Sequence, residues 1–469
     1  MKKRNRRKNN GIRRRYLAAI LFPCVFTALA VTAILRETEE AGAGETVGRI
    51  AAGADSKSGE LPEAGASGAS AEDFGEKESA VGEDAGGSGT KGSEQEEQEE
   101  GRGEQNEEEA PEVTLVMVGD ILLHTPVAQS GRTDSGEYDF SGVFAEMKEE
   151  IQGADLALVN QEVIIGGEEL GVSGYPAFNA PYELGDALAE TGFDVVLHAT
   201  NHALDKGKRG ILNCLSFWRE NYPEMGILGI HDNAAKGEEV YVCELDGIRI
   251  AILNYTYGTN GIGLPEDMPF AVDMLERDRV IQDLEKAGEA ADFVIVCPHW
   301  GTEYTLEATA EQRSWAELFA ENGADLVIGT HPHVIEPVEW VAAGEQSEVT
   351  AGEEPDSGEN GEGTLVYYSL GNFVNWTSGT GKGVANRMVG GMARVRIGLD
   401  ETGEAGILSY DVEPLVCHVE QGFGGVRVYP LAEYTEELAA RNEIVGQDGD
   451  FSLEYCQELV NSVFGAIEE

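Results

Sequence analysis

Basic residues are scarce in this chain of 469 residues, which has 33 Lys and Arg against 86 Asp and Glu and a formal net charge of −53. Because nucleic acid attracts clustered Lys and Arg, the composition excludes it as a partner. Nine of the basic residues lie within residues 1–15, so the rest of the chain is strongly acidic. Such a surface stays soluble and repels anionic lipids.

Cysteine is also rare, with six residues in the whole chain. A disulfide scaffold normally shows an even, clustered set, whereas the five cysteines beyond the N-terminal segment are odd in number and widely spaced. We therefore expect these five to be small buried hydrophobic side chains: Cys214, Cys243, Cys297, Cys417 and Cys456.

A long apolar run follows the basic start of the chain. Residues 16–35, YLAAILFPCVFTALAVTAIL, carry no charge, and about 20 apolar residues are enough to cross a hydrocarbon core. The positive-inside rule leaves the basic residues 1–15 in the cytoplasm. We therefore predict a single-pass anchor in the cell membrane with an extracytoplasmic C-terminal domain. A signal peptide cleaved after Ala30 is the alternative.

Composition divides the rest of the chain into further regions. Residues 36–111 are rich in Gly, Ser, Ala, Glu and Gln and have too few apolar groups to offset the entropy of ordering, which predicts a disordered acidic stalk. Residues 342–363 have the same composition and are expected to form a flexible insertion. We expect the insertion to interrupt a folded domain, residues 112–420, which is followed by a helical extension, residues 421–469.

Aliphatic runs and amphipathic stretches alternate through most of the folded domain. Runs such as VTLVMV, DFVIVC and TLVYYSL are typical of strands buried on both faces. Stretches between them, such as YELGDALAET and ILNCLSFWRE, have helical periodicity. The alternation predicts an α/β fold, with GGMARVRIGLD and ILSYDVEPLVCHV as two later antiparallel strands.

Polar residues follow the ends of five of the predicted strands, where sites form in open α/β sheets. Asp120, Glu162, Asn201 and His299 each follow a different run, and His331 and His333 follow a fifth. Two imidazoles this close after a buried strand suit Zn, Fe, Mn or Ni. A mixture of carboxylate, Asn carbonyl and imidazole is typical of a two-metal hydrolytic site, which activates water.

The motifs that carry these residues resemble those of a known family. In chain order they are GD, NQE, TNHALDKG, NYTYGTNG, HWGTEY, GTHPHVIEPVE and YYSLGNF. They look like the capsule-synthesis CapA family, named for poly-γ-glutamate capsule formation, over about residues 113–376. The family's domain is similar to the calcineurin-like metallophosphatases. The resemblance implies a metallophosphatase-like four-layer α/β sandwich and a role in making, exporting or anchoring an anionic polymer with other polymer-synthesis subunits.

The resemblance also implies roles for individual residues. His202 matches a residue that donates a proton or orients the leaving group. Leu122 stands where metallophosphatases carry a His, and Glu162 stands in place of their bridging Asp. How many metals bind, and whether phosphoesters are hydrolysed, therefore stays open. The ligands implied for a divalent ion (Mn, Fe or Zn) are Asp120, Glu162, Asn201, His299, His331 and His333.

Five further residues are candidates for substrate binding: Tyr255, Tyr257, Asn260, Glu303 and Tyr304. Ordinary loop positions are the alternative for the first three. His198, His231 and His418 match no motif and are expected to be structural. Two other functions stay open beside capsule synthesis, namely a stand-alone extracytoplasmic phosphoesterase and a non-catalytic scaffold of a polymer-synthesis complex.

Overall fold

The computed structural model describes residues 111–343, 363–400 and 402–465. The predicted anchor, nearly all of the predicted stalk and most of the predicted insertion lie outside these ranges. Within them, none of the helices is both long and apolar enough to span a bilayer. The five cysteines in these ranges are free and buried, which confirms the expectation for them.

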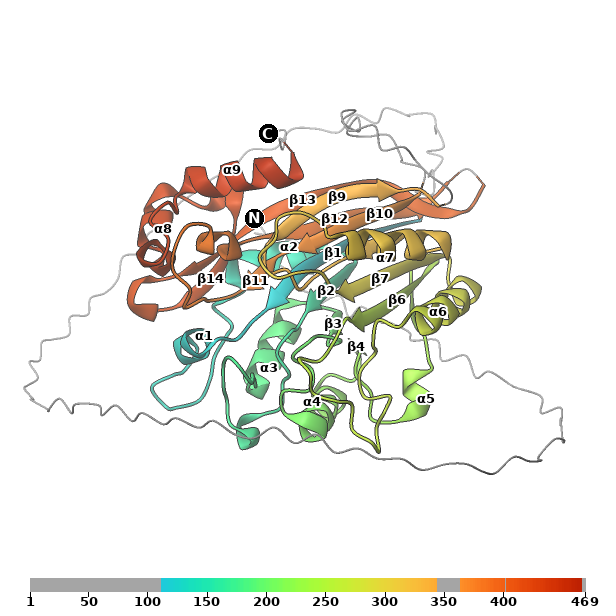
Figure 1. Cartoon of the computed structure of the whole chain (residues 1–469), viewed down its shortest axis with the longest axis horizontal. Helices are drawn as coiled ribbons and strands as arrows, with labels where there is room; N and C mark the ends of the chain where they lie inside the picture. The colour runs from blue at the N-terminus through green and yellow to red at the C-terminus, as the bar shows by residue number, and fades with distance from the viewer. Residues whose placement is uncertain (1–110, 344–362, 401, 466–469) are drawn as a thin grey trace, which may run out of the picture. The chain divides into compact units, whose positions relative to one another are not determined.

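The first sheet has the strand order β14-β13-β12-β1-β2-β3-β4, and β11 pairs with β1 (Figure 1). Strands β1 to β4 run parallel, whereas β12 to β14 are antiparallel neighbours. The strands are β1 (Glu112–Ile121), β2 (Leu156–Asn160), β3 (Val195–Leu197), β4 (Gly226–Leu228), β11 (Asn372–Val374), β12 (Val389–Leu399), β13 (Ala405–Val419) and β14 (Val426–Pro430).

The second sheet has the order β5-β6-β7-β8-β10-β9. Its four central strands are parallel, and β5 and β9 are antiparallel edge strands. The strands are β5 (Tyr241–Leu245), β6 (Ile248–Thr256), β7 (Phe293–His299), β8 (Leu326–Ile328), β9 (Ile335–Val341) and β10 (Thr364–Leu370).

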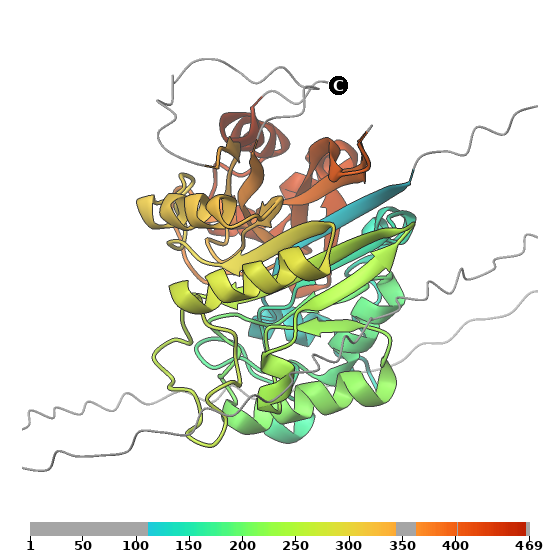
Figure 2. The same cartoon turned by 90° about the vertical axis from the view of Figure 1, so that its right-hand side faces the viewer.

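The helices cover the outer faces of the two sheets. Their bounds are α1 (Thr125–Ser130), α2 (Lys148–Gly153), α3 (Tyr182–Thr191), α4 (Gly207–Asn221), α5 (Ala234–Gly237), α6 (Arg277–Ala290), α7 (Ala310–Glu321), α8 (Glu436–Arg441) and α9 (Leu453–Phe464). Figure 2 shows α6 and α7, in yellow, against one face of the second sheet.

Alternation along the strands produces the layers. Leu115 and Met117 of β1 pack with Ile250 of β6 and Ile295 of β7 in a core between the two sheets. The intervening residues of the first sheet face α2, α3 and α4, and those of the second face α6 and α7. The order is therefore helices, sheet, sheet, helices, so the predicted α/β class is confirmed.

Residues 421–469 contribute more to the domain than the expected helical extension. They include β14, which extends the first sheet by pairing with β13. Cys456, Leu459 and Val460 of α9 are buried in the core on that sheet's outer face. The short run VRVYP forms a strand because an antiparallel neighbour is available, which its own length does not reveal.

Candidate metal centre

The ends of β1, β2, β3, β7 and β8 bring the predicted ligands to one edge of the domain. Asp120 lies near the end of β1, and its register partners are Asn160 of β2 and Asn372 of β11. His299 ends β7. The six predicted ligands are each no more than 5% exposed: Asp120, Glu162, Asn201, His299, His331 and His333.

Glu162 lies at the centre of this cluster. Its Oε1 is 3.8 Å from His299 Nε2, 3.7 Å from His333 Nε2 and 3.9 Å from His202 Nε2. Neither of its carboxylate oxygens has a hydrogen-bond donor in the described part of the chain. Burial, and then the charge of Asp120, raise the pKa of Glu162 well above its usual value. A cation among these groups would offset the cost of burying this carboxylate.

Two groups of possible ligand atoms share that carboxylate. One comprises Glu162, His299 and His331, and the other comprises Asp120, Glu162 and His333, with the atoms of each group within 4.8 Å of one another. His331 Nδ1 also has no partner among the described residues. Imidazole and carboxylate together suit Mn, Fe or Zn, so these residues fit a divalent ion, and Glu162 belongs to both groups.

Asp120 is held in place by groups from three directions. Its Oδ1 accepts a 2.8 Å hydrogen bond from Asn160 Nδ2, and its Oδ2 accepts one of 3.2 Å from the backbone N–H of His331. His333 Nδ1 lies 3.1 Å from the same Oδ2. Such supporting bonds orient ligands around a metal, so Asn160 is a supporting residue at this site.

His299 is oriented through both ring nitrogens. Its Nε2 lies 3.1 Å from Asn201 Oδ1, and its Nδ1 lies 3.0 Å from Thr330 Oγ1. Burial, and then the neighbouring imidazole of His331, hold the pKa of His299 well below its usual value. The ring is therefore neutral near pH 7, which is the form that coordinates a metal.

His202 is fixed beside the cluster by an acidic partner. Asp205 Oδ2 accepts a 2.7 Å hydrogen bond from His202 Nδ1 and a second one of 2.7 Å from the backbone N–H of Phe178. The Phe178 ring packs edge-on against the imidazole, with centroids 4.7 Å apart. This arrangement leaves His202 Nε2 on the side of Glu162. A group that exchanges a proton with a substrate at the cluster must face it in this way.

The two histidines after β8 occupy an unusual backbone. His331 has φ 102° and His333 has φ 60°, in the region that non-glycine residues rarely adopt. Their ring centroids are 5.7 Å apart. Strained backbone that points two imidazoles into one cluster is typical of functional sites.

Four of the five candidate substrate residues lie around the cluster. The Tyr257 ring is 4.6 Å from that of His331, and the Tyr304 ring is 6.0 Å from that of His333. Asn260 Nδ2 lies 3.3 Å from His202 Nδ1. The charge of the exposed Glu303 contributes to the raised pKa of Glu162.

Tyr255 is the exception, because it does not lie at the cluster, and the prediction that it binds substrate is wrong. Its ring is buried with α6 in the core of the second sheet's outer face, where its hydroxyl donates to Asp283 over 3.2 Å. Tyr255 lies inside β6 and faces the helix, whereas β6 ends at Thr256 and Tyr257 lies in the loop beyond it. The alternation of the strand therefore does not carry over to Tyr257, and its proximity in sequence does not place Tyr255 at the cluster.

The three histidines expected to be structural have partners of their own. His198 Nε2 accepts a hydrogen bond from Trp218 Nε1 over 3.2 Å. His231 Nε2 lies 2.6 Å from Asp273 Oδ2, and His418 Nδ1 lies 3.0 Å from the Tyr434 hydroxyl. None of the three belongs to the candidate ligand groups of the described residues.

Sequence reasoning did not single out the supporting residues Asn160, Thr330 and Asp205. All three lie inside motifs of the family resemblance, Asn160 in NQE, Asp205 in TNHALDKG and Thr330 in GTHPHVIEPVE, which was the available signal. His124 is not among the residues predicted from the sequence. Burial, followed by the charges of His333 and His202, lowers its pKa to about 4.

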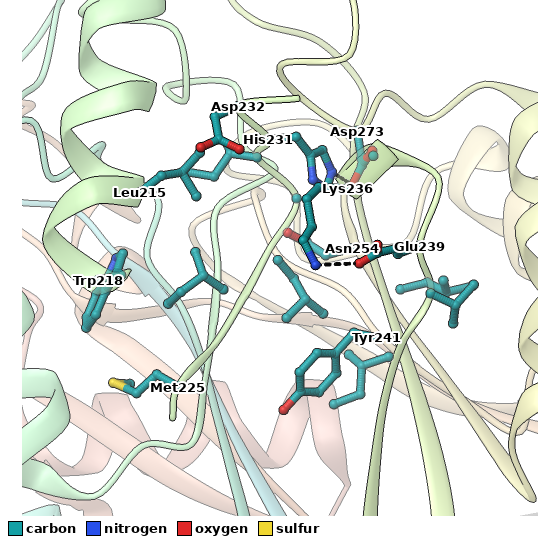
Figure 3. A pocket seen from close by; sticks show the side chains of 18 of the residues that line it. Leu215, Trp218, Met225, His231, Asp232, Lys236, Glu239, Tyr241, Asn254 and Asp273 are labelled. Atoms are coloured by element: carbon teal, nitrogen blue, oxygen red, sulfur yellow. Dashed lines mark hydrogen bonds and ion pairs between the residues drawn. The ribbon is translucent and has the colours of Figure 1, made fainter. Parts of the chain in front are cut away.

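A cavity of about 500 Å³ lies away from this cluster, lined by residues of α4, β5 and β6 (Figure 3). Its charged groups are paired, for example Lys236 with Glu239 at 2.6 Å and Arg219 with Asp232 at 2.7 Å. None of the candidate ligand groups found in the described ranges lines it. Its size alone does not make it the candidate site.

Comparison with known proteins identifies relatives of the region that carries the cluster. The model of the family described as "Bacterial capsule synthesis protein PGA_cap" matches residues 114–377. The PGA biosynthesis protein CapA of Bacillus subtilis (strain 168) is 32% identical over 195 residues, 40% of this chain and 45% of that protein. The capsule biosynthesis protein CapA of Bacillus anthracis is 25% identical over 283 residues, 57% of this chain and 62% of that protein. The chain thus spans about half to three fifths of these relatives' length.

Solved structures give weaker matches. A 5'-nucleotidase precursor from Thermus thermophilus is 15% identical with a TM-score of 0.37, covering 65% of this chain and 54% of that one. An NAD nucleotidase from Haemophilus influenzae is 13% identical with a TM-score of 0.37, covering 66% of this chain and 58% of that one. TM-scores this low do not establish a shared fold by themselves.

Proposed function

We propose that this chain, which belongs to the bacterial capsule synthesis protein PGA_cap family, works in the assembly of an anionic surface polymer such as poly-γ-glutamate. It does so through a metal centre of metallophosphatase type. The observation that carries the metal proposal is Glu162, a buried carboxylate without a donor that lies within 4 Å of three imidazole nitrogens.

The proposed ligands are the residues of the cluster. Glu162 would be shared by two groups of ligands, one with His299 and His331 and one with Asp120 and His333, and Asn201 Oδ1 lies 3.1 Å from His299 Nε2 of the first group. A divalent ion held there would polarise an oxygen of the substrate and lower the pKa of water.

The chain's own residues handle the proton. Asp205 holds His202 by Nδ1 and orients the ring, so that His202 Nε2 is the group that would donate a proton to the leaving oxygen. Tyr257 and Tyr304, each about half exposed, flank the cluster and limit how a substrate chain can lie across it. These roles define a hydrolase-type site without fixing the bond that is cleaved.

The location of the protein is part of the same proposal. Nine basic residues precede an apolar run of 20 residues and an acidic segment, which supports a single-pass anchor with the metal-bearing domain outside the cell. An extracytoplasmic site would meet the polymer after or during its export, where other polymer-synthesis subunits would also lie.

Elemental analysis of the purified full-length chain tests the metal proposal. We expect bound Mn, Fe or Zn in the wild type and at least about tenfold weaker metal binding after His333→Ala, since losing a ligand or its support commonly has that effect. His231→Ala is the matched control, because His231 pairs with Asp273 outside the cluster. If His333→Ala kept its metal while His231→Ala lost it, the assignment of the metal site to the cluster would be wrong.

A stand-alone phosphoesterase is the second candidate, favoured by the Asp205–His202 pair beside Glu162. Turnover of a simple phosphoester by the purified chain, lost on His202→Ala, would support it if cells carrying that variant still make the polymer. Loss of polymer in cells carrying His202→Ala would support the capsule role. A wild type that binds no divalent ion would leave the scaffold function.

A further inference from the structure

A smaller cavity, of about 200 Å³, opens directly beside the candidate metal centre. The candidate ligand His333 forms part of its wall, together with His124, Tyr304 and Arg387. Asp and Glu outnumber Lys and Arg by 86 to 33 in the chain, yet no carboxylate of the described residues lines this cavity. Its lining is thus basic and neutral within an acidic protein, which favours an anionic occupant.

Arg387 is held in the cavity wall and has an N–H group without a hydrogen-bond partner among the described residues. Its Nη1 donates to Thr377 Oγ1 over 2.8 Å, and its guanidinium carbon lies 3.5 Å from the centroid of the Tyr304 ring. Its backbone carbonyl accepts a 2.9 Å hydrogen bond from Asn372 Nδ2. Its Nε, however, is buried and has no partner among the described residues.

A buried donor without a hydrogen-bond partner costs about 1–3 kcal/mol of stability, so the Nε of Arg387 favours an acceptor beside it. The planar guanidinium matches the two oxygens of a carboxylate or a phosphate. Arg387 and His333 line the same cavity, and the Tyr304 ring, which contacts Arg387, has its centroid 6.0 Å from that of His333. An anion held by Arg387 in this cavity would therefore lie beside the candidate metal centre.

We propose that this cavity is an oxyanion subsite of the metal centre, in which Arg387 binds a carboxylate or phosphate group of the substrate next to the reacting group. The proposal rests on the proposed function and deepens it by naming the recognised group and the residue that recognises it. A protein with a formal charge of −53 repels a free polyanion, so a local cation of this kind is what allows an anionic chain to approach.

Calorimetric titration of the full-length chain with two probes, inorganic phosphate and glutarate, tests the subsite, with and without added Mn²⁺. We expect Arg387→Gln to weaken binding of at least one probe by about tenfold or more and to leave the metal content unchanged. Arg387→Lys should give an intermediate affinity, because it keeps the charge without the planar fork. Lys382→Gln is the control, since it removes a positive charge that is 87% exposed from the same segment.

Each outcome decides the proposal. Selective loss of phosphate binding assigns the subsite to a phosphate group, and selective loss of glutarate binding assigns it to a carboxylate. Unchanged binding of both probes by Arg387→Gln overturns the subsite, as does equal weakening by Lys382→Gln or a wild type that binds neither probe. If Arg387→Gln does not fold, Arg387→Lys with wild-type affinity for both probes overturns it. The titrations without metal keep this result separate from failure of the metal proposal.

Discussion

Glu162 shows at the scale of one residue how a binding site differs from a core position. A carboxylate that is 1% exposed and has no donor among the described residues opposes folding, whereas the same group between imidazoles is a good ligand. The sequence motif NQE identified this residue, but it could not show that both of its oxygens are unpaired.

We predict that Glu162→Gln has opposite effects on stability and on metal binding. Without metal, the amide costs less to bury than the carboxylate, so the free energy of unfolding should stay the same or rise by about 1–2 kcal/mol. Metal affinity should fall by at least about tenfold. Urea unfolding in the presence of a chelator and titration with Mn²⁺ measure the two effects.

His198→Ala is the matched control for that experiment. It removes the acceptor for Trp218 Nε1 and leaves a gap in a packed core, so it should lower the free energy of unfolding by about 2–4 kcal/mol and leave metal affinity unchanged. The assignment of Glu162 would fail if its variant lost stability in chelator while binding metal normally.

At the scale of elements, the strands that carry the site could be predicted because their signal is local. Continuous aliphatic runs indicated β1 and β2 of the first sheet and β7 and β8 of the second, and the polar residues after them had to lie at the carboxyl ends of parallel strands. Features that depend on distant partners could not be predicted. Tyr255 faces α6 instead of the cluster, and Arg387 reaches the site only because Thr377 and Tyr304 fold against it.

The turn between β8 and β9 provides a prediction about backbone strain. His331 has φ 102°, a backbone conformation that glycine adopts without strain and alanine does not. Without metal, His331→Gly should therefore be more stable than His331→Ala by about 1 kcal/mol, the reverse of the usual order. Both variants should bind metal weakly. Chemical unfolding in chelator compares them, and an alanine variant as stable as the glycine variant would show that the turn relaxes.

The contact between α7 and β9 predicts a pH dependence. Glu336 of β9 is fully buried and accepts a 2.6 Å hydrogen bond from Gln312 Nε2 of α7. Burial raises its pKa from 4.5 to about 8. Between these values the folded chain binds more protons than the unfolded chain, so this group's contribution to stability falls as pH rises, by up to about 1.4 kcal/mol per pH unit.

Glu336→Gln should remove that contribution, because the amide resembles the protonated carboxyl group and still accepts from Gln312. Urea unfolding at pH 5, 7 and 8.5 should give a flatter stability curve for this variant than for the wild type. Glu339→Gln is the control from the same strand, where Glu339 forms an ion pair with Arg313 at the surface. A wild-type slope in Glu336→Gln would mean that other groups set the pH dependence.

At the scale of the whole molecule, the charge distribution and the architecture support the same function. Two packed sheets bury the hydrophobic core, so the strand ends are free to carry polar groups that contribute little to the stability of that core. The strongly acidic chain keeps polyanions away except where Arg387 and the imidazoles gather. Under the proposed function, the domain would act locally on a polymer chain rather than bind along its length.

The topology of the protein in the membrane is the last prediction, and it depends on the residues before the folded domain. Nine basic residues, an uncharged run at 16–35 and an acidic segment at 36–111 predict that the folded domain is displayed outside the cell. Protease added to intact cells should therefore cut within 36–111 and release a fragment that contains the domain, because a compact domain resists cleavage better than an acidic stalk. Blotting for the domain measures the release, and a cytoplasmic protein should stay intact as the control. A domain that is protected in intact cells and digested only after lysis would place it in the cytoplasm and remove the extracytoplasmic part of the proposed function.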